Sequence, residues 1–169
     1  MRLIDRKLMD RLDTEASASP RRRSHQNWHD PDADTVQRFL VHMQAGTYVR
    51  PHCHAQQQRV ETTLLVDGGA DLILFDETGT VIKRVELSAG GDQRGVELAP
   101  GDWHSFHVPD RATLFEVKQG PYDPALDKCF AQWAPPADSS TRLITVPVSS
   151  NRIRSAPPSS SRVVSTRCC

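Results

Sequence analysis

Short apolar runs separated by Gly and Pro fill residues 35–117 and constrain the fold of this chain most strongly. Each run holds four to eight residues rich in Val, Leu, Phe and Thr, which is the length and composition typical of β-strands. The connections are too short for helical crossovers, so neighbouring strands should be antiparallel. The segment therefore predicts an all-β sandwich or barrel. The expected strands are residues 37–43, 47–54, 61–66, 71–75, 81–87, 95–98, 104–108 and 113–117.

Turn residues mark where these strands should reverse. Asp76-Glu-Thr-Gly79 in particular predicts a hairpin turn, because Gly79 can adopt positive φ without steric cost. The other expected turns contain Ala45-Gly46, Asp67-Gly-Gly69, Gly90-Gly91 and Pro100-Gly101.

The segments on either side of the strand-rich region differ from it in composition. Ile4, Leu8, Met9 and Leu12 have helical spacing and predict a short amphipathic helix within residues 4–16. Residues 137–169 are dominated by Ser, Thr, Pro and Arg, which predicts a disordered tail because too little apolar surface is available for burial. We expect three parts: residues 1–30 as the N-terminal helix and lead-in segment, 31–136 as the barrel, and 137–169 as the tail.

Charge and cysteine content limit the functions to consider. The 169 residues carry 21 basic and 21 acidic side chains, so overall charge indicates neither a nucleic acid nor a membrane partner. The first residues lack a long apolar run, which predicts no signal peptide and a cytoplasmic protein. Four cysteines, two of them adjacent at Cys168 and Cys169, do not form the pattern of a disulfide framework.

A His-x-His pair, His52 and His54, lies in one of the expected strands. Side chains alternate along a strand, so both imidazoles should face the same side while Cys53 faces the other. The same alternation places Tyr48 and Arg50 on the histidine side. We therefore expect these two residues to face the cavity as catalytic or substrate-contacting groups.

Two further residues complete a candidate metal site. Glu61 begins the next expected strand, and a hairpin would return it beside the histidines. His104 follows the Pro100-Gly101 turn and would join the others through tertiary closure of the barrel. Imidazole and carboxylate ligands suit Fe, Mn, Ni, Cu or Zn, so the sequence predicts one divalent ion without selecting among these metals.

Several charged and aromatic side chains allow two interpretations. Arg21 to Arg23 could contact an anion or form a solvated surface run. Glu116 and Lys118 share one strand face, which could border the cavity or solvent. The Pro-rich closing segment with Tyr122, Lys128 and Trp133 is expected to pack over the outside of the barrel.

The candidate ligands and their flanking glycines resemble the two motifs of the cupin superfamily. Gly46, His52-x-His54, Glu61 and Gly68 are similar to the first motif, and Gly95, Pro100-Gly101 and His104 to the second. The resemblance implies a jelly-roll barrel, a double-stranded β-helix, that holds one divalent metal through His52, His54, Glu61 and His104. The chain departs from the pattern in its longer spacing between His54 and Glu61 and in Val108, which stands where an Asn is often found.

A more detailed resemblance is to the WbuC-type cupin metalloproteins associated with bacterial O-antigen and lipopolysaccharide biosynthesis. It implies a small-molecule substrate such as a sugar or nucleotide sugar, and three functions remain open. They are metal-dependent isomerisation or epimerisation of an activated sugar, an iron dioxygenase reaction, and non-catalytic binding of a saccharide or small anion. Pairing through edge strands would give a homodimer. The stretches that carry the resemblance are Ser19–Arg23 with Asn27 and His29, Val36–Leu40, Gly46–His54, Pro100–His104, Phe115–Tyr122 and Phe130–Pro135.

Overall fold

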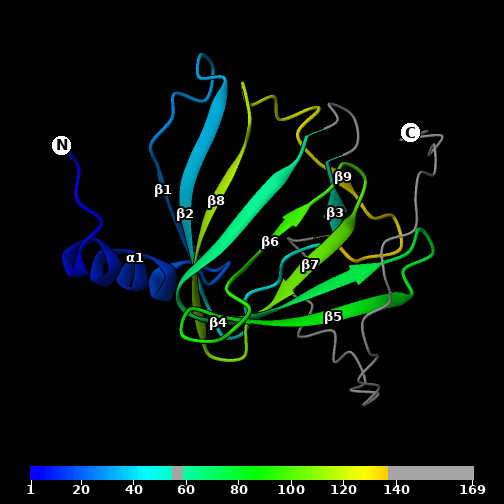
Figure 1. Ribbon diagram of the computed structural model, residues 1–169, viewed down its shortest axis with the longest axis horizontal. Helices are drawn as coiled ribbons and strands as arrows, with labels where there is room; N and C mark the ends of the chain where they lie inside the picture. Colours follow the sequence, from blue (N-terminus) through cyan, green and yellow to red (C-terminus); the bar gives the residue numbers. More distant parts are fainter. Residues whose placement is uncertain (55–58, 137–169) are drawn as a thin grey trace.

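The computed structural model describes residues 1–54 and 59–136. The tail predicted for residues 137–169 lies outside the described residues. The described part consists of one helix and nine strands, arranged as a strongly curled antiparallel sheet (Figure 1). The elements are α1 (Arg6–Ala18), β1 (Arg23–Asn27), β2 (Val36–Gln44), β3 (His52–Cys53), β4 (Glu61–Phe75), β5 (Val81–Ser88), β6 (Gly95–Leu98), β7 (Trp103–His107), β8 (Arg111–Gln119) and β9 (Cys129–Phe130).

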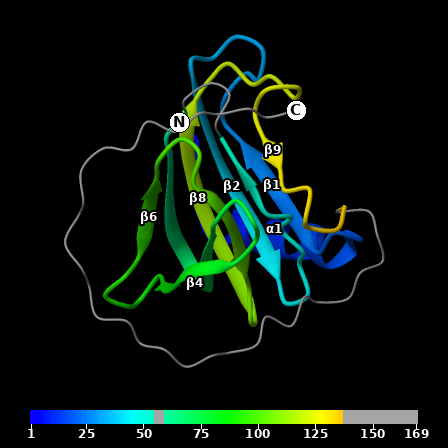
Figure 2. The same ribbon diagram turned by 90° about the vertical axis from the view of Figure 1, so that its right-hand side faces the viewer.

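The strands form two faces that share β4. One face, sheet A, has the order β1-β2-β8-β4-β6, and the other, sheet B, has the order β5-β4-β7-β3-β9. Every described strand pair is antiparallel, as the short connections predict. Figure 2 shows β1, β2 and β8 of sheet A running side by side. The predicted all-β jelly-roll is confirmed.

The long strand β4 passes from sheet A to sheet B at a glycine pair. Residues up to Gly68 pair with β8, and residues from Gly69 onward pair with β5. Gly68 has φ +71°, and a Cβ at this position would lie 2.1 Å from the carbonyl oxygen of Arg111. Only glycine satisfies both conditions without strain. The turn predicted at residues 67–69 is therefore wrong: the glycines bend one continuous strand.

An apolar core fills the space between the two sheets. Leu114 of β8 is fully buried, and Leu72 of β4 is 1% exposed. Burial of side chains of this size stabilises a fold by about 1.5–3 kcal/mol each. The core cluster comprises Val41, Met43, Leu65, Ala70, Leu72, Leu87, Leu98, Phe106, Val108, Ala112 and Leu114.

Helix α1 packs against β1 and β2 at one end of sheet A (Figure 1). It begins two residues later than predicted because the Asp5 side chain accepts a hydrogen bond from the Leu8 amide and caps the helix. Leu12 and Ala16 are buried against the sheet, and the Ser24 hydroxyl donates to the Leu12 carbonyl. No helix in the described residues is both long and apolar enough to cross a membrane.

Five of the predicted strands form within two residues of the expected limits. The expected strand 47–54 is reduced to β3, and the expected strands 61–66 and 71–75 form the single strand β4. Strands β1 and β9 were not predicted. The Asp76 turn is confirmed: the Gly79 amide donates to the Asp76 carbonyl, and Gly79 has φ +91°.

Candidate metal centre

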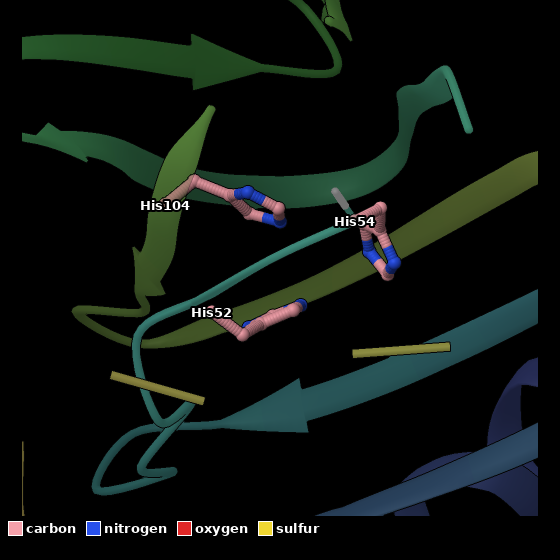
Figure 3. A group of neighbouring side chains, drawn as sticks. All are labelled: His52, His54 and His104. Atoms are coloured by element: carbon pink, nitrogen blue, oxygen red, sulfur yellow. The ribbon is translucent and has the colours of Figure 1, made fainter. Parts of the chain in front are cut away.

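Three histidines from the neighbouring strands β3 and β7 and from the residue after β3 converge inside the barrel (Figure 3). His52 lies on β3 directly opposite His104 on β7, and His54 follows β3 by one residue. One ring nitrogen from each histidine lies within 4.8 Å of the corresponding atoms of the other two. All three side chains are buried, so the structure brings the predicted histidines together out of solvent.

Each of these imidazoles is oriented by a backbone carbonyl. The Nδ1 atom of His52 lies 2.9 Å from the Arg50 carbonyl, and that of His104 lies 2.8 Å from the Asp102 carbonyl. The Nδ1 atom of His54 lies 2.5 Å from the Asp127 carbonyl. A carbonyl oxygen can only accept, so each Nδ1 must carry the proton. In a neutral ring this leaves the Nε2 lone pair available to a metal ion.

Glu61 brings a carboxylate to the same place. Its Oε2 atom lies 3.0 Å from Nε2 of His54, and its Oε1 atom lies 3.7 Å from Nε2 of His104. Three of these buried atoms, Oε2 of Glu61 and Nε2 of His54 and His104, have no properly oriented hydrogen-bond partner among the described residues. Buried polar atoms are rarely left without partners, and a cation between them would satisfy all three. The donor set therefore fits a divalent ion.

Electrostatics favours the protonation states that bind metal. Burial holds the pKa of His52 well below its usual value and also lowers the pKa of His104. Although burial raises the pKa of Glu61, the neighbouring His54, His104 and Lys118 outweigh it and hold this pKa well below its usual value. Neutral imidazoles and an ionised carboxylate are the forms in which these groups ligate metal.

A buried ionic network of Lys118, Asp127 and Arg59 contacts Glu61. Lys118 of β8 places its Nζ atom 3.6 Å from Glu61 and 3.1 Å from Asp127. The other carboxylate oxygen of Asp127 lies 3.0 Å from the Arg59 guanidinium. Asp127 also holds His54 through its carbonyl, so one residue links the imidazole to the network. Glu61 is thereby fixed in place.

A cavity of about 390 Å³ opens onto the centre. Both apolar and polar side chains line it, and strands β1, β2 and β8 of sheet A contribute residues of both kinds. A volume of this order accommodates a small organic molecule. The residues that line it are Arg21, Arg23, His25, Asn27, His29, Pro31, Gln37, Phe39, Val41, Met43, Val49, His52, Glu61, His104, Phe106, Glu116, Lys118, Tyr122, Asp127 and Lys128.

Tyr48 and Arg50 do not line this cavity, contrary to the prediction that they face it. The Tyr48 hydroxyl donates to the Pro135 carbonyl, and Arg50 donates to the Ala131 carbonyl while its guanidinium lies 5.1 Å from the Phe130 ring centre. The alternation argument fails because residues 47–51 are not part of a strand. In this arrangement both side chains anchor the closing segment.

Other polar residues reach the cavity that the sequence did not assign to it. Glu116 and Lys118 border the cavity, so the cavity alternative for this strand face is the correct one. Tyr122 and Lys128 also line it, so the prediction that they pack outside is wrong. Trp133 lies outside, against Phe75. The alternation of side chains along β8 predicts that Glu116 and Lys118 share a face. The closing segment that carries Tyr122 and Lys128 has no periodic pattern from which their positions could be predicted.

Cys53 is directed away from the histidines, as strand alternation predicts. It packs with Cys129, its direct partner on β9, and with Trp103. The metal-ligand cluster in the described residues consists of His52, His54 and His104 and excludes Cys53.

Known proteins share this arrangement of strands. The salicylate 1,2-dioxygenase of Pseudoaminobacter salicylatoxidans in complex with gentisate aligns with a TM-score of 0.52 and 14% identity, over 69% of this chain and 33% of that one. A structure of the DMSP lyases RdDddP and RnDddQII aligns with a TM-score of 0.50 and 15% identity, over 66% of this chain and 53% of that one. A cupin 2 conserved barrel domain protein from Rhodopseudomonas palustris aligns with a TM-score of 0.47 and 17% identity, over 60% of this chain and 63% of that one.

The curled antiparallel barrel agrees with the first two of these alignments. The chain has the cupin fold. At such low identities the alignments show the cupin fold alone. The chain spans less than two thirds of the length of each of these three proteins.

Sequence comparisons add little to the structural ones. A family model described as a domain of unknown function, DUF6016, matches residues 4–87. That range includes His52, His54 and Glu61 but ends before His104. Among curated proteins, none matches this sequence.

Proposed function

We propose that this cupin barrel is a metal-dependent enzyme that holds one divalent ion through His52, His54, His104 and Glu61 and acts on a small molecule in the adjoining cavity. The observation that carries the proposal is the hydrogen bonding of the three imidazoles. Each Nδ1 atom is committed to a carbonyl oxygen, which directs three Nε2 atoms toward one another and toward a carboxylate. Without a cation, these acceptors would face each other in a buried space.

A purely structural histidine cluster explains this arrangement less well. A structural histidine such as His42 has partners for both ring nitrogens, Thr113 at 2.8 Å and Asp13 at 3.1 Å. In His54 and His104 the Nε2 atom is buried and makes no properly oriented hydrogen bond with the described residues, although the Glu61 carboxylate lies 3.0 Å and 3.7 Å away. This difference supports a metal-ligand role for His54 and His104.

When bound, such an ion supplies Lewis acidity, and a redox-active metal can also supply electron transfer. The surrounding side chains define where a substrate can lie. Val41 and Phe106 give the cavity apolar surface, and Lys118 lies 3.6 Å from the Glu61 carboxylate. Glu116 borders the cavity as a proton-transfer candidate: burial and the charge of Glu61 raise its pKa to about 7.

Two finer predictions rest on the resemblance alone. An activated sugar as substrate, and a place in surface-polysaccharide synthesis, come from the WbuC-type motifs rather than from the geometry of the cavity. The iron dioxygenase alternative uses the same ligands, and oxygen dependence of turnover would separate it from isomerisation.

Metal binding is tested first with purified protein. After chelation and dialysis, titration with Zn²⁺, Mn²⁺ and Fe²⁺ should show one ion per chain. His52→Ala and Glu61→Gln should weaken binding at least tenfold. Matched controls are His107→Ala and Glu97→Gln, which alter exposed or partly exposed groups outside the cavity. Failure of all three ions to bind, or equal losses in the controls, would overturn the metal site.

Turnover is tested second. The metal-loaded protein is incubated with sugar phosphates and nucleotide sugars, with and without oxygen, and products are followed by mass spectrometry and NMR. Any activity should disappear in His52→Ala while the fold, measured by circular dichroism, persists. Activity that survives complete removal of metal would contradict a metal-dependent enzyme.

A further inference from the structure

One wall of the cavity is built by the edge strand β1. Arg23, His25 and Asn27 occupy alternate positions on β1 and all line the cavity. Their register partners on β2 are Met43, Val41 and Phe39, which line the cavity too. One face of this two-strand edge is therefore directed at the ligand space.

Part of the charge in the cavity wall is internally balanced. Lys118 lies between the carboxylates of Glu61 and Asp127, and Arg59 pairs with the second oxygen of Asp127. The cations of Lys118 and Arg59 thus balance the carboxylates of Glu61 and Asp127. These four charges require no charged ligand for neutralisation.

The remaining charges are not balanced. Arg21, Arg23 and Lys128 line the cavity, and none forms an ion pair with a carboxylate in residues 1–54 and 59–136. The Nε atom of Arg23 is buried and lacks a hydrogen-bond acceptor within those residues. Glu116 is the one cavity carboxylate left to oppose these three cations, and its pKa of about 7 leaves it partly protonated at neutral pH.

An unpaired guanidinium with a buried N–H costs free energy unless an acceptor arrives from outside the chain. A divalent ion at the histidines would add further positive charge to the same cavity. The excess of cations over anions therefore selects a negatively charged ligand over a neutral one.

We propose that the molecule bound in this cavity carries an oxyanion, either a carboxylate or a phosphate, that Arg23 and Lys128 bind from the cavity wall. The proposal rests on the proposed function, because it places the rest of that molecule at the metal centre. Arg23 supplies a planar fork of donors suited to two oxygens of one anionic group. Lys128 supplies a compact charge from the closing segment after β8.

The test measures binding of simple anions to the metal-loaded protein by isothermal titration calorimetry. Malonate represents a carboxylate ligand, inorganic phosphate a phosphate ligand, and malonamide an uncharged molecule of similar size. We expect saturable binding of at least one anion and at least tenfold weaker binding of malonamide. Arg23→Gln and Lys128→Gln should each weaken binding of that anion at least tenfold, with Arg23→Lys intermediate.

Two controls keep this result separate from the metal proposal. Arg94→Gln removes a guanidinium bonded to the Gly91 carbonyl outside the cavity and should bind anions like the unmodified protein. Metal content is measured for every variant, and Arg23→Gln should keep its full complement of metal.

The outcomes separate the two proposals. Loss of anion binding with unchanged metal content supports the oxyanion site, and the anion that binds identifies its chemistry. If the protein binds no metal, the proposed function fails, while anion binding that Arg23→Gln abolishes would still support the oxyanion site. Unchanged anion affinity in both charge-removing variants, or equal binding of malonamide, would overturn it.

Discussion

At the scale of single residues, hydrogen-bond partners distinguish the histidines. His42 and His104 are almost equally buried, at 3% and 1% exposure, so burial alone does not separate a structural histidine from a ligand. The two nitrogens of His42 contact Thr113 on β8 and Asp13 on α1. This ring connects helix to sheet.

Replacing His42 with Ala should therefore reduce stability and leave metal binding intact. The Thr113 hydroxyl would lose its partner in a buried site, which costs about 1–3 kcal/mol. Urea unfolding measures the loss, and metal titration of the folded variant measures the ligand role. His107→Ala is the control, with an expected change below about 0.5 kcal/mol. Loss of metal binding in His42→Ala would contradict the assignment.

Lys118→Met should destabilise the metal-free protein strongly. The substitution leaves the buried carboxylates of Glu61 and Asp127 without the cation between them, which costs about 3–5 kcal/mol for a broken buried pair. A metal ion would restore positive charge beside Glu61. Thermal unfolding with chelator and with excess Zn²⁺ should therefore show a larger metal-induced rise in Tm for the variant than for the unmodified protein.

The exposed Lys83 on β5 offers the matched control for this experiment. Lys83→Met should show the same rise in Tm on metal addition as the unmodified protein. Equal rises in Lys118→Met and Lys83→Met would contradict the compensation between Lys118 and the metal.

At the scale of elements, the glycine bend in β4 is the most specific backbone requirement. Gly68→Ala places a Cβ against the Arg111 carbonyl at a residue with positive φ, so we expect a loss of stability of at least about 2 kcal/mol. Gly101→Ala imposes positive φ alone, because nothing lies within 4 Å of a Cβ there. Gly90→Ala, with neither constraint, should change stability least. Chemical denaturation of the three variants should give that order, and a reversed order would contradict the bend.

Periodic elements could be predicted from the sequence, and irregular ones could not. Strand alternation on β8 correctly grouped Glu116 with Lys118 because both lie within a regular strand. The same reasoning failed for Tyr48 and Arg50, where the chain leaves strand geometry before Pro51 and the pattern has no structural counterpart. The closing segment that brings Lys128 into the cavity has no periodic sequence pattern. Its position follows from tertiary contacts such as that between Asp127 and Lys118.

At the scale of the whole molecule, the buried charges make stability depend on pH in two opposing ways. Below their ordinary pKa of 6.5, His52 and His104 take up protons in the unfolded chain, whereas burial keeps them neutral in the folded protein. Their contribution to stability is therefore lost as pH falls below 6.5. Glu116 acts in the opposite direction. Its pKa is raised from 4.5 to about 7, so its contribution is present below 4.5 and is lost as pH rises through about 7.

Glu116→Gln should unmask the histidine contribution in metal-free protein. Between pH 5 and 6.5, the free energy of unfolding should rise more steeply with pH in the variant, by up to about 1.4 kcal/mol per pH unit. Urea unfolding in the presence of chelator measures both slopes. Glu97→Gln, an exposed residue on β6, should keep the original slope, and identical slopes for all three proteins would contradict a raised pKa at Glu116.

The membership of β4 in both sheets has a mechanical consequence. Glu61 stands at the sheet A end of this strand, while Leu74, near its other end, pairs with His104 in sheet B. The bend at Gly68 therefore lies between the part of β4 that carries the carboxylate and the part that pairs with His104. A change in that bend would shift Glu61 relative to His104 while leaving both side chains as they are.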